Sequence, residues 1–319
     1  MQSELIKKLG VKYPIIQGAM SWVANPSLVS AVANAGGLGI LACGHASGEI
    51  VRKLIRETKS LTDKPFGINV LLTSQYVEEV VEVVCEEKLK VITTGAGSPG
   101  KYMDRLKGNG TIVIPVVASV ALAKRMESIG ADAIICEGME AGGHIGKTTT
   151  MNLVPHVVDS VRIPVIAAGG IADGRGIAAA FMLGASAVQM GTRFVVAYES
   201  TSHQNFKDAI IKAKDIDTVI TGQITGHPVR VLRNKLTRNY LKVEKEITSD
   251  ENPDFERLEA FGKGALQRAV IEGDKERGSF MSGQSAGLVT KEQSCQDIIQ
   301  ELMQEYQAVI KKQAELLTV

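Results

Sequence analysis

The chain has 319 residues, of which 45% are hydrophobic and 22% are charged. This length exceeds one typical domain, but it fits a barrel of about 200 to 250 residues with a further unit. The 36 lysine and arginine residues balance 35 aspartates and glutamates, so charge gives no reason to expect nucleic-acid or membrane-surface binding.

The sequence carries no sign of export or of a membrane span. No apolar run approaches the roughly 20 residues of a membrane helix, and the N-terminus MQSELIKKLG lacks the apolar core of a signal peptide. We therefore expect a cytoplasmic protein. Four widely spaced cysteines without a C-x-x-C pair predict free thiols in a reducing compartment. They are Cys43, Cys85, Cys136 and Cys295.

Short apolar runs alternate with longer helical segments as far as residue 194. Eight runs are typical of strands buried on both faces, and the segments between most of them are long enough for a crossover helix. This alternation predicts an α/β fold, a parallel TIM (β/α)8 barrel. The predicted strands span residues 14–20, 38–42, 65–72, 91–97, 111–117, 131–138, 163–168 and 185–190. The predicted helices span residues 26–35, 48–61, 77–87, 148–161 and 174–183, with one more ending at 129.

The last two predicted strands each stop abruptly at glycine. The first runs into Gly169 and Gly170, and the second runs into Gly191 and Thr192. Without side chains, the backbone N–H groups at these positions can reach an anion. In a TIM barrel the loops after strands 7 and 8 lie side by side and commonly form a phosphate site. The sequence therefore predicts a phosphate cradle here.

The pattern changes after residue 197, where the chain becomes more polar and has no further strand–helix repeats. We expect a barrel over residues 1–197, a smaller, mainly helical substrate or lid domain over 198–277, and C-terminal helices over 278–319 that return to the barrel. The expected helical segments are 206–213, 229–246, 254–272, a glycine-opened helix at 278–289, and an amphipathic packing helix at 295–317.

Candidate ligand contacts lie at the carboxyl ends of the strands, where barrel enzymes carry their active sites. The first strand ends in Gln17, Gly18, Ala19 and Met20, whose small residues would let a flat ligand approach the backbone. A tight turn explains the same residues equally well. Asn69, a polar amide inside an apolar run, must find hydrogen-bond partners, either in the core or on a ligand.

The loop EGMEAGGHIG after the sixth strand holds two carboxylates, Glu137 and Glu140, and a histidine, His144, framed by glycines. A core histidine has no reason to occupy such a loop, so we predict that His144 is catalytic. His227 is a weaker candidate. The chain shows no H-x-x-x-H, H-E-x-x-H or paired-cysteine spacing, so we predict no metal site.

A nicotinamide site of the Rossmann type is not supported. No G-x-G-x-x-G stands between a strand and a helix with an acidic residue about twenty positions further on. The phosphate cradle is therefore expected to hold a tightly bound nucleotide or the phosphate of a substrate.

The motifs QGAM, EGMEAGGHIG, PVIAAGGIADG and AVQMGTRF, in this order and with the Asn69 strand, closely resemble the flavin-dependent enoyl-acyl-carrier-protein reductases of the enoyl reductase II group. The match covers nearly the whole chain. The nitronate monooxygenases share the same set more loosely, whereas TTGAGSP, SVALAKRMESIGADA and FMSGQSAGLV resemble the reductase branch.

The resemblance implies an FMN-binding barrel whose mouth is covered by a small helical domain. Such enzymes are usually dimeric. They use NADH or NADPH and take their substrate from acyl carrier protein. It also implies a response to monovalent cations, for which no site is visible in the sequence. His144 would be the catalytic histidine. The implied flavin contacts are Gly18, Ala19, Met20 and Asn69 at the ring or ribityl chain, Gly169, Gly170, Gly191 and Thr192 at the phosphate, and Glu137, Ser282, Gly283 and Gln284 near the flavin.

Two other enzyme functions and one binding function compete with this interpretation. A nitronate monooxygenase would use the same flavin and His144 as a base. A flavin-free barrel enzyme would hold a sugar phosphate in the cradle, and a regulatory metabolite-binding barrel would leave His144 without a role.

A basic stretch without acidic residues offers a surface for an acidic carrier protein. It contains Arg230, Arg233, Lys235, Arg238 and Lys242. On a helix, Arg230, Arg233 and Lys242 would share about one face. An ordinary solvated helix surface explains the stretch equally well.

Overall fold

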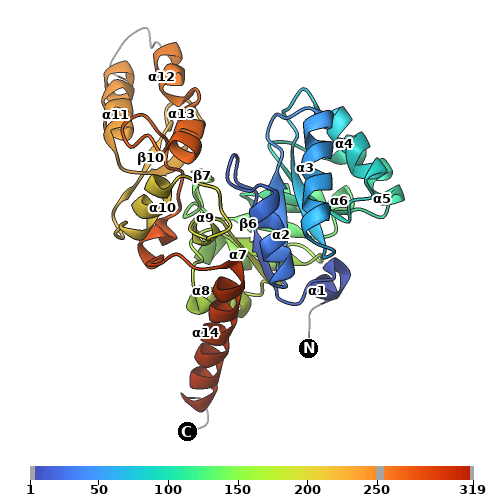
Figure 1. The fold of residues 1–319 in the computed structure, drawn as a ribbon. Helices are drawn as coiled ribbons and strands as arrows, with labels where there is room; N and C mark the ends of the chain where they lie inside the picture. Colours follow the sequence, from blue (N-terminus) through green and yellow to red (C-terminus); the bar gives the residue numbers. More distant parts are fainter. Residues whose placement is uncertain (1–3, 249–254, 317–319) are drawn as a thin grey trace.

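A computed structural model of the protein describes residues 4–248 and 255–316 and contains a closed barrel of eight parallel strands (Figure 1). The last barrel strand pairs with the first, where Ile15 lies opposite Val188 and Gln17 opposite Met190. The predicted TIM barrel is therefore confirmed. In order around the barrel the strands are β1 (Ile15–Gln17), β2 (Leu38–Ala42), β3 (Phe66–Leu71), β4 (Val91–Gly95), β5 (Ile112–Val117), β6 (Ile134–Glu137), β8 (Val165–Ala168) and β9 (Ala187–Met190).

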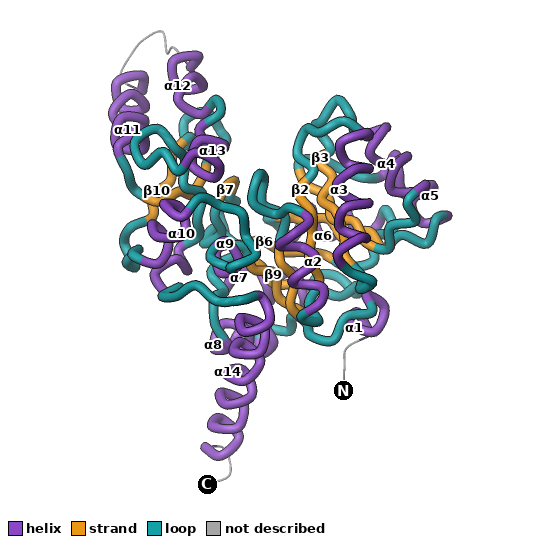
Figure 2. Tube along the Cα trace, in the orientation of Figure 1, coloured by secondary structure: helices purple, strands orange, loops and turns teal. Residues whose placement is uncertain are grey.

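Helices surround this barrel, as Figure 2 shows with purple helices outside the orange strands. They lie close to the predicted ranges, and a short helix that the sequence pattern did not predict, α5, lies between β4 and β5. The helices up to residue 195 are α1 (Glu4–Leu9), α2 (Pro26–Asn34), α3 (Gly48–Leu61), α4 (Val77–Glu86), α5 (Met103–Gly108), α6 (Val120–Ser128), α7 (Thr150–Val158), α8 (Gly174–Met182) and α9 (Thr192–Val195). No helix in the described ranges is long and apolar enough to cross a membrane.

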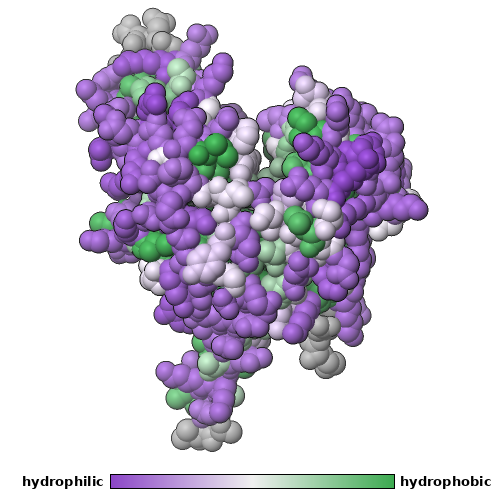
Figure 3. All heavy atoms as spheres, viewed as in Figure 1, coloured by the Kyte–Doolittle hydropathy of each residue, from purple (hydrophilic) through white to green (hydrophobic). Residues whose placement is uncertain are grey.

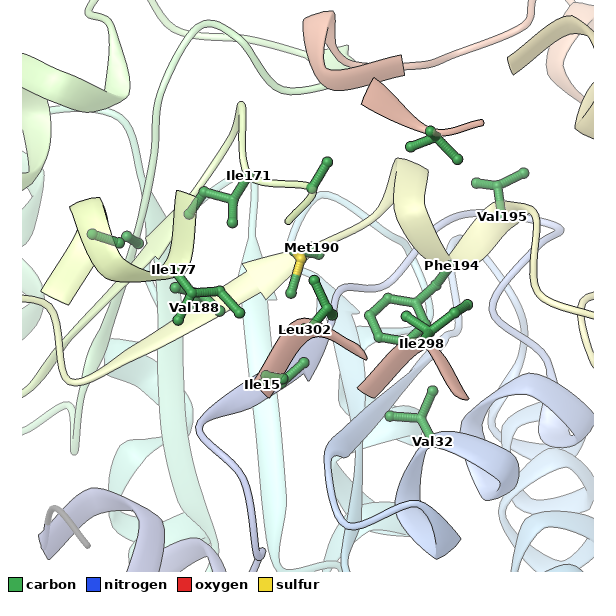
Figure 4. Packing of buried hydrophobic residues seen from close by; sticks show 14 of the residues in the cluster. Ile15, Val32, Ile171, Ile177, Val188, Met190, Phe194, Val195, Ile298 and Leu302 are labelled. Carbon is green, nitrogen blue, oxygen red and sulfur yellow. The ribbon is translucent and has the colours of Figure 1, made fainter. Parts of the chain in front are cut away.

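Alternate residues of each strand serve two different cores. Ile16, Ile114 and Ile166 belong to one cluster inside the barrel. Ile15 and Val188, one position away, pack outward against the surrounding helices (Figure 4). Burying each such side chain contributes about 1.5 to 3 kcal/mol, which is why the strands read as continuous apolar runs.

The C-terminal helix α14 (Cys295–Leu316) packs on the barrel from the far end of the sequence. Its apolar residues Ile298, Ile299 and Leu302 are buried against α8 and α2. Figure 4 shows Ile298 and Leu302 beside Phe194 and Met190. The predicted packing face is therefore the first half of this helix, while its last turns extend away from the barrel (Figure 1).

The second unit contains a small antiparallel sheet as well as helices. Its strand order is β10-β11-β7, and β7 (Gly143–His144) comes from the loop after β6. The remaining elements are α10 (Gln204–Ile211), β10 (Thr218–Thr221), β11 (Val229–Leu232), α11 (Lys235–Thr248), α12 (Phe255–Gly262) and α13 (Ala265–Gln267), followed by a π-helical turn (Arg268–Glu272) and a 3-10 helix (Gln284–Leu288).

Three helix predictions in this part of the chain were wrong in detail. Residues 229–232 form β11 rather than the start of a helix, because Val229 and Arg230 pair with the loop strand β7. Residues 278–283 are extended, with Met281 bridged to Val231, so only the end of the predicted 278–289 helix turns. The predicted 254–272 helix is interrupted at Gly264, whose φ of 70° is left-handed, and residue 254 lies outside the described ranges.

All four cysteines are free thiols, and Cys43, Cys136 and Cys295 are buried. Burial raises the pKa of Cys43 and of Cys136 to about 12. These thiols therefore stay protonated and behave as small apolar core residues.

We expect Leu302→Ala to destabilise the protein by about 2 to 5 kcal/mol, because Leu302 is only 1% exposed and truncation leaves a cavity under α14. The matched control is Leu316→Ala on the same helix, where the side chain is 62% exposed and the expected change is within about 0.5 kcal/mol. Chemical unfolding followed by circular dichroism measures both. Equal destabilisation would show that α14 does not anchor on the barrel.

Candidate active site

One pocket opens where the carboxyl ends of β1, β6, β8 and β9 meet. Its cavity volume is about 100 Å³. Nine of the predicted cofactor residues line it. They are Gly18, Ala19, Met20, Glu137, Gly169, Gly170, Gly191, Thr192 and Gly283. Glu140, Ala141, Gly142, Gln189, Met281 and Ser285 also contribute to the wall. Tertiary structure thus brings together motifs that lie far apart in the sequence.

The glycines after β8 and β9 form the predicted cradle. Gly169 and Gly170 have left-handed φ values of 95° and 75°, and a Cβ at Gly169 would lie 2.8 Å from the Gly138 carbonyl oxygen. The backbone N–H groups of Gly169, Gly170 and Thr192 have no hydrogen-bond partner in the described ranges. Such N–H groups beside the pocket are suited to phosphate oxygens.

The C-terminal segment closes one side of the pocket. Gly283 donates its backbone N–H to Thr192 Oγ1 at 3.0 Å, and Gln284 donates to the Glu140 carbonyl at 2.9 Å. The packing is tight, because a Cβ at Gly142 would lie 2.6 Å from the backbone of Ser282. Ser282 is buried and its Oγ has no partner among the described residues, while Gln284 is exposed, and neither side chain lines the pocket.

Polar side chains cap the top of the barrel interior. The alternation along β3, β4, β6 and β9 turns Asn69, Thr93, Glu137 and Gln189 to the same side as the inner core. Asn69 donates to Thr93 Oγ1 at 2.8 Å, so its amide is satisfied within the barrel, and it does not line the pocket. Gln189 does line it. Gln189 was not among the predicted contacts, although a lone amide at a strand end is the same signal that singled out Asn69.

The two carboxylates of the loop have different surroundings. Glu140 accepts hydrogen bonds from the Thr150 backbone N–H, at 2.9 and 3.0 Å, and from Thr150 Oγ1 at 3.0 Å, so it caps the start of α7. Glu137 makes no side-chain hydrogen bond in the described ranges. Burial raises its pKa to about 7. The carboxyl of Glu137 therefore exchanges its proton near neutral pH.

His144 lies on β7, where it pairs with Val229 of β11. Its side chain is exposed and does not line the pocket, but Gly142, two residues earlier, does. The surrounding protein removes part of the water around the imidazole. This desolvation, together with the nearby His227, lowers the pKa of His144 from its ordinary value. The imidazole is therefore neutral at pH 7, with one nitrogen free to accept a proton and the other to donate a hydrogen bond.

The residues of the pocket fit a flavin mononucleotide. The backbone N–H groups of Gly169, Gly170 and Thr192 have no partner in the described ranges. Among the residues that the structure describes, no lysine or arginine lines the pocket, so a phosphate there would be held by backbone groups and hydroxyls. The wall is closely packed, because a Cβ at Gly169 would lie 2.8 Å from the Gly138 carbonyl oxygen and one at Gly18 would lie 2.9 Å from the Gln189 side chain.

The predicted basic helix face was wrong at Arg230. This residue lies on β11, is 3% exposed, and donates to the Met139 carbonyl and to Thr218 Oγ1, both at 3.1 Å. It therefore ties the small sheet to the loop beside the pocket. Arg233, Arg238 and Lys242 are exposed, and Lys235 is paired with Glu276 at 2.7 Å.

The chain is similar to known proteins over nearly its whole length. The family model described as nitronate monooxygenase matches residues 2–81 and 72–305. FabK from Thermotoga maritima has a solved structure with a TM-score of 0.94 and 50% identity, and the match covers 99% of each chain.

Two further relatives carry the names of other activities. The (3aS,4S,5R,7aS)-5-hydroxy-7a-methyl-1-oxo-octahydro-1H-indene-4-carboxyl-CoA dehydrogenase of Rhodococcus jostii is 34% identical and covers 94% of both chains. A probable nitronate monooxygenase of Staphylococcus saprophyticus is 33% identical over 88% of this chain and 91% of its own.

We expect Gly169→Ala to weaken FMN binding more than tenfold, which corresponds to about 1.4 kcal/mol, because the added Cβ meets the Gly138 carbonyl inside the cradle. Gly226→Ala is the matched control, since Gly226 has a φ of 76° but open space around its Cβ position. Titration of flavin fluorescence measures both affinities. If both variants bind FMN like the unchanged protein, the cradle does not hold the phosphate.

Proposed function

The chain belongs to the nitronate monooxygenase family, and on this premise we propose that it is an FMN-dependent enoyl-acyl-carrier-protein reductase of bacterial type II fatty acid synthesis. It reduces a trans-2-enoyl thioester to the saturated thioester with NADH or NADPH. The observation that carries the proposal is the likeness to FabK, at 50% identity over 99% of both chains. The order of the pocket motifs supports it independently.

When bound, FMN supplies hydride transfer, from reduced nicotinamide and then to the β-carbon of the enoyl thioester. The backbone N–H groups of Gly169, Gly170 and Thr192 would hold its phosphate, and Glu137 and Gln189 line the same pocket. Nicotinamide leaves before the thioester enters, because both need access to one open mouth.

His144 meets the remaining chemical demand. Hydride addition at the β-carbon drives negative charge onto the thioester oxygen, which calls for a hydrogen-bond donor there and a proton at the α-carbon. A neutral imidazole has one N–H to donate. His144 lies next to Gly142 and Gly143 on the loop that forms the pocket wall, so it supplies the hydrogen bond or the proton from that side.

The substrate is carried by acyl carrier protein, which is acidic as a class. The exposed side chains Arg233, Arg238 and Lys242 offer it a positive surface on the second unit. The proposed enzyme is a cytoplasmic homodimer, and its activity responds to monovalent cations, as the resemblance implies. In Figure 3 the surface is hollowed between the second unit and the barrel, which leaves room for a carrier-bound chain.

A second candidate is the oxidation of alkyl nitronates by oxygen, with His144 as the base. The family description and the probable nitronate monooxygenase relative favour it. The two functions share the pocket. They differ in the electron donor, which is reduced nicotinamide or a nitronate, and in the electron acceptor, which is the enoyl thioester or oxygen. The flavin-free sugar-phosphate enzyme is the weaker alternative, because it has no counterpart among these relatives.

The proposed function is tested anaerobically with purified holoprotein. Reduced nicotinamide is expected to bleach the flavin absorbance, and crotonyl thioester is then expected to restore it without oxygen. His144→Ala should retain FMN but restore the absorbance about 10²-fold to 10³-fold more slowly, the usual cost of losing one such donor. His156→Ala, which removes an exposed histidine on α7, is the control and should react at the unchanged rate.

Two results would contradict these assignments. If crotonyl thioester leaves the bleached flavin unchanged while a nitronate reduces the oxidised flavin directly, the monooxygenase function replaces the reductase. If His144→Ala reacts at the normal rate with thioester, the reductase stands but His144 is not its catalytic group.

We expect charge reversal at Arg233 and Arg238 to raise the KM for a carrier-linked substrate severalfold, because both side chains are exposed and positive. The KM for the matching coenzyme A thioester should not change. Steady-state kinetics with the two substrates provide the comparison. Equal effects on both would mean that this surface does not dock the carrier.

A further inference from the structure

Unlike Glu140, Glu137 receives no hydrogen bond at its carboxyl group in the described ranges. It ends β6, pairs in register with Ala168, and points with Ile135 toward the inside of the barrel. Its neighbour in the loop, Glu140, has three hydrogen bonds from Thr150, whereas the carboxyl of Glu137 has none in the described ranges. It lines the same pocket as Gly18 and Gln189.

Among the residues that the structure describes, no positively charged side chain lines the pocket around Glu137. The pocket wall from β1, β8, β9 and the C-terminal segment contributes glycine, alanine, methionine, amide and hydroxyl groups, and its one other ionisable side chain is the carboxylate of Glu140. The nearby Arg230 interacts with Glu140 and bonds to the Met139 carbonyl, and His144 is influenced by His227. Burial alone shifts the pKa of Glu137, with no charged partner.

The same pocket contains the phosphate cradle. An ionised Glu137 would place a negative charge in the pocket that receives a phosphate, with no cation in the wall to offset either charge. A protonated Glu137 removes this conflict and gains an O–H that can donate a hydrogen bond to the ligand.

We propose that Glu137 binds the flavin nucleotide as a neutral carboxylic acid, so that capture of the nucleotide above neutral pH takes up one proton. This proposal rests on FMN as the cofactor, which is part of the proposed function, but not on the identity of the substrate that the flavin reduces.

Linkage gives the expected pH dependence. A carboxyl whose pKa is about 7 in the free protein is protonated below pH 7. In that range its ionisation does not change the affinity for FMN. Above it, binding must restore the proton, so the Kd rises about tenfold for each pH unit. Between pH 6 and pH 8.5 the Kd for FMN should therefore rise about 30-fold.

The test compares the unchanged protein with Glu137→Gln, since the amide has the shape and neutrality of the protonated acid. The FMN-free forms of both are titrated with FMN from pH 6 to pH 8.5. Both proteins share the effect of the second ionisation of the FMN phosphate, near pH 6, and the Kd values are corrected for it. After this correction we expect the 30-fold loss of affinity only in the unchanged protein. The Kd of Glu137→Gln should stay nearly constant. Glu140→Gln is the control and should keep the pH dependence.

A second measurement does not depend on the variant. Calorimetric titration of the unchanged protein at pH 8, in buffers of different ionisation enthalpy, should detect uptake of about one proton per FMN bound. A Kd that is independent of pH, or no proton uptake, overturns the role of Glu137 but leaves the flavin enzyme intact. Absence of FMN binding at every pH overturns both this proposal and the proposed function.

Discussion

Closure of the barrel is the constraint on which the site depends. Hydrogen bonds between β9 and β1 join the last strand to the first, and Gly18 donates its N–H to the Met190 carbonyl just beyond the paired residues. This places the QGAM turn directly beside Gly191. The approach is so close that a Cβ on Gly18 would collide with the Gln189 side chain. Closing the sheet therefore brings the QGAM turn and the glycine loop after β9 into one pocket wall.

A second layer of contacts makes the pocket from segments outside the barrel. The loop after β6 supplies β7 to the small sheet, and the extended chain at residues 280–283 bonds both to β11 and to Thr192. Arg230 and Glu140 are structural here, because the first holds the loop and the second caps α7. Polar residues near the pocket therefore fall into two groups: those available to a ligand and those whose hydrogen bonds keep the surrounding segments in place.

The electrostatics of the pocket are unusual for an anion site. Among the described residues, backbone N–H groups and hydroxyls replace lysine and arginine, so the site would attract a phosphate by fixed dipoles rather than by net charge. Such dipoles act well only where water is excluded and competing charges are absent. The protonation of one half-buried carboxyl, Glu137, would therefore matter more in this pocket than in one lined by arginine.

The sequence by itself determined the barrel and the cradle, because both depend on local patterns. Buried strands are apolar throughout, crossover helices are amphipathic, and glycines such as Gly169 and Gly170 stand where the backbone must turn left-handed. Only the tertiary structure decided that residues 229–232 are a strand, that Arg230 is buried, that residues 278–283 are extended, and that Gln189 lines the pocket. These features depend on partners distant in the chain, whose hydrogen bonds and packing outweigh the small intrinsic preferences that a local pattern records.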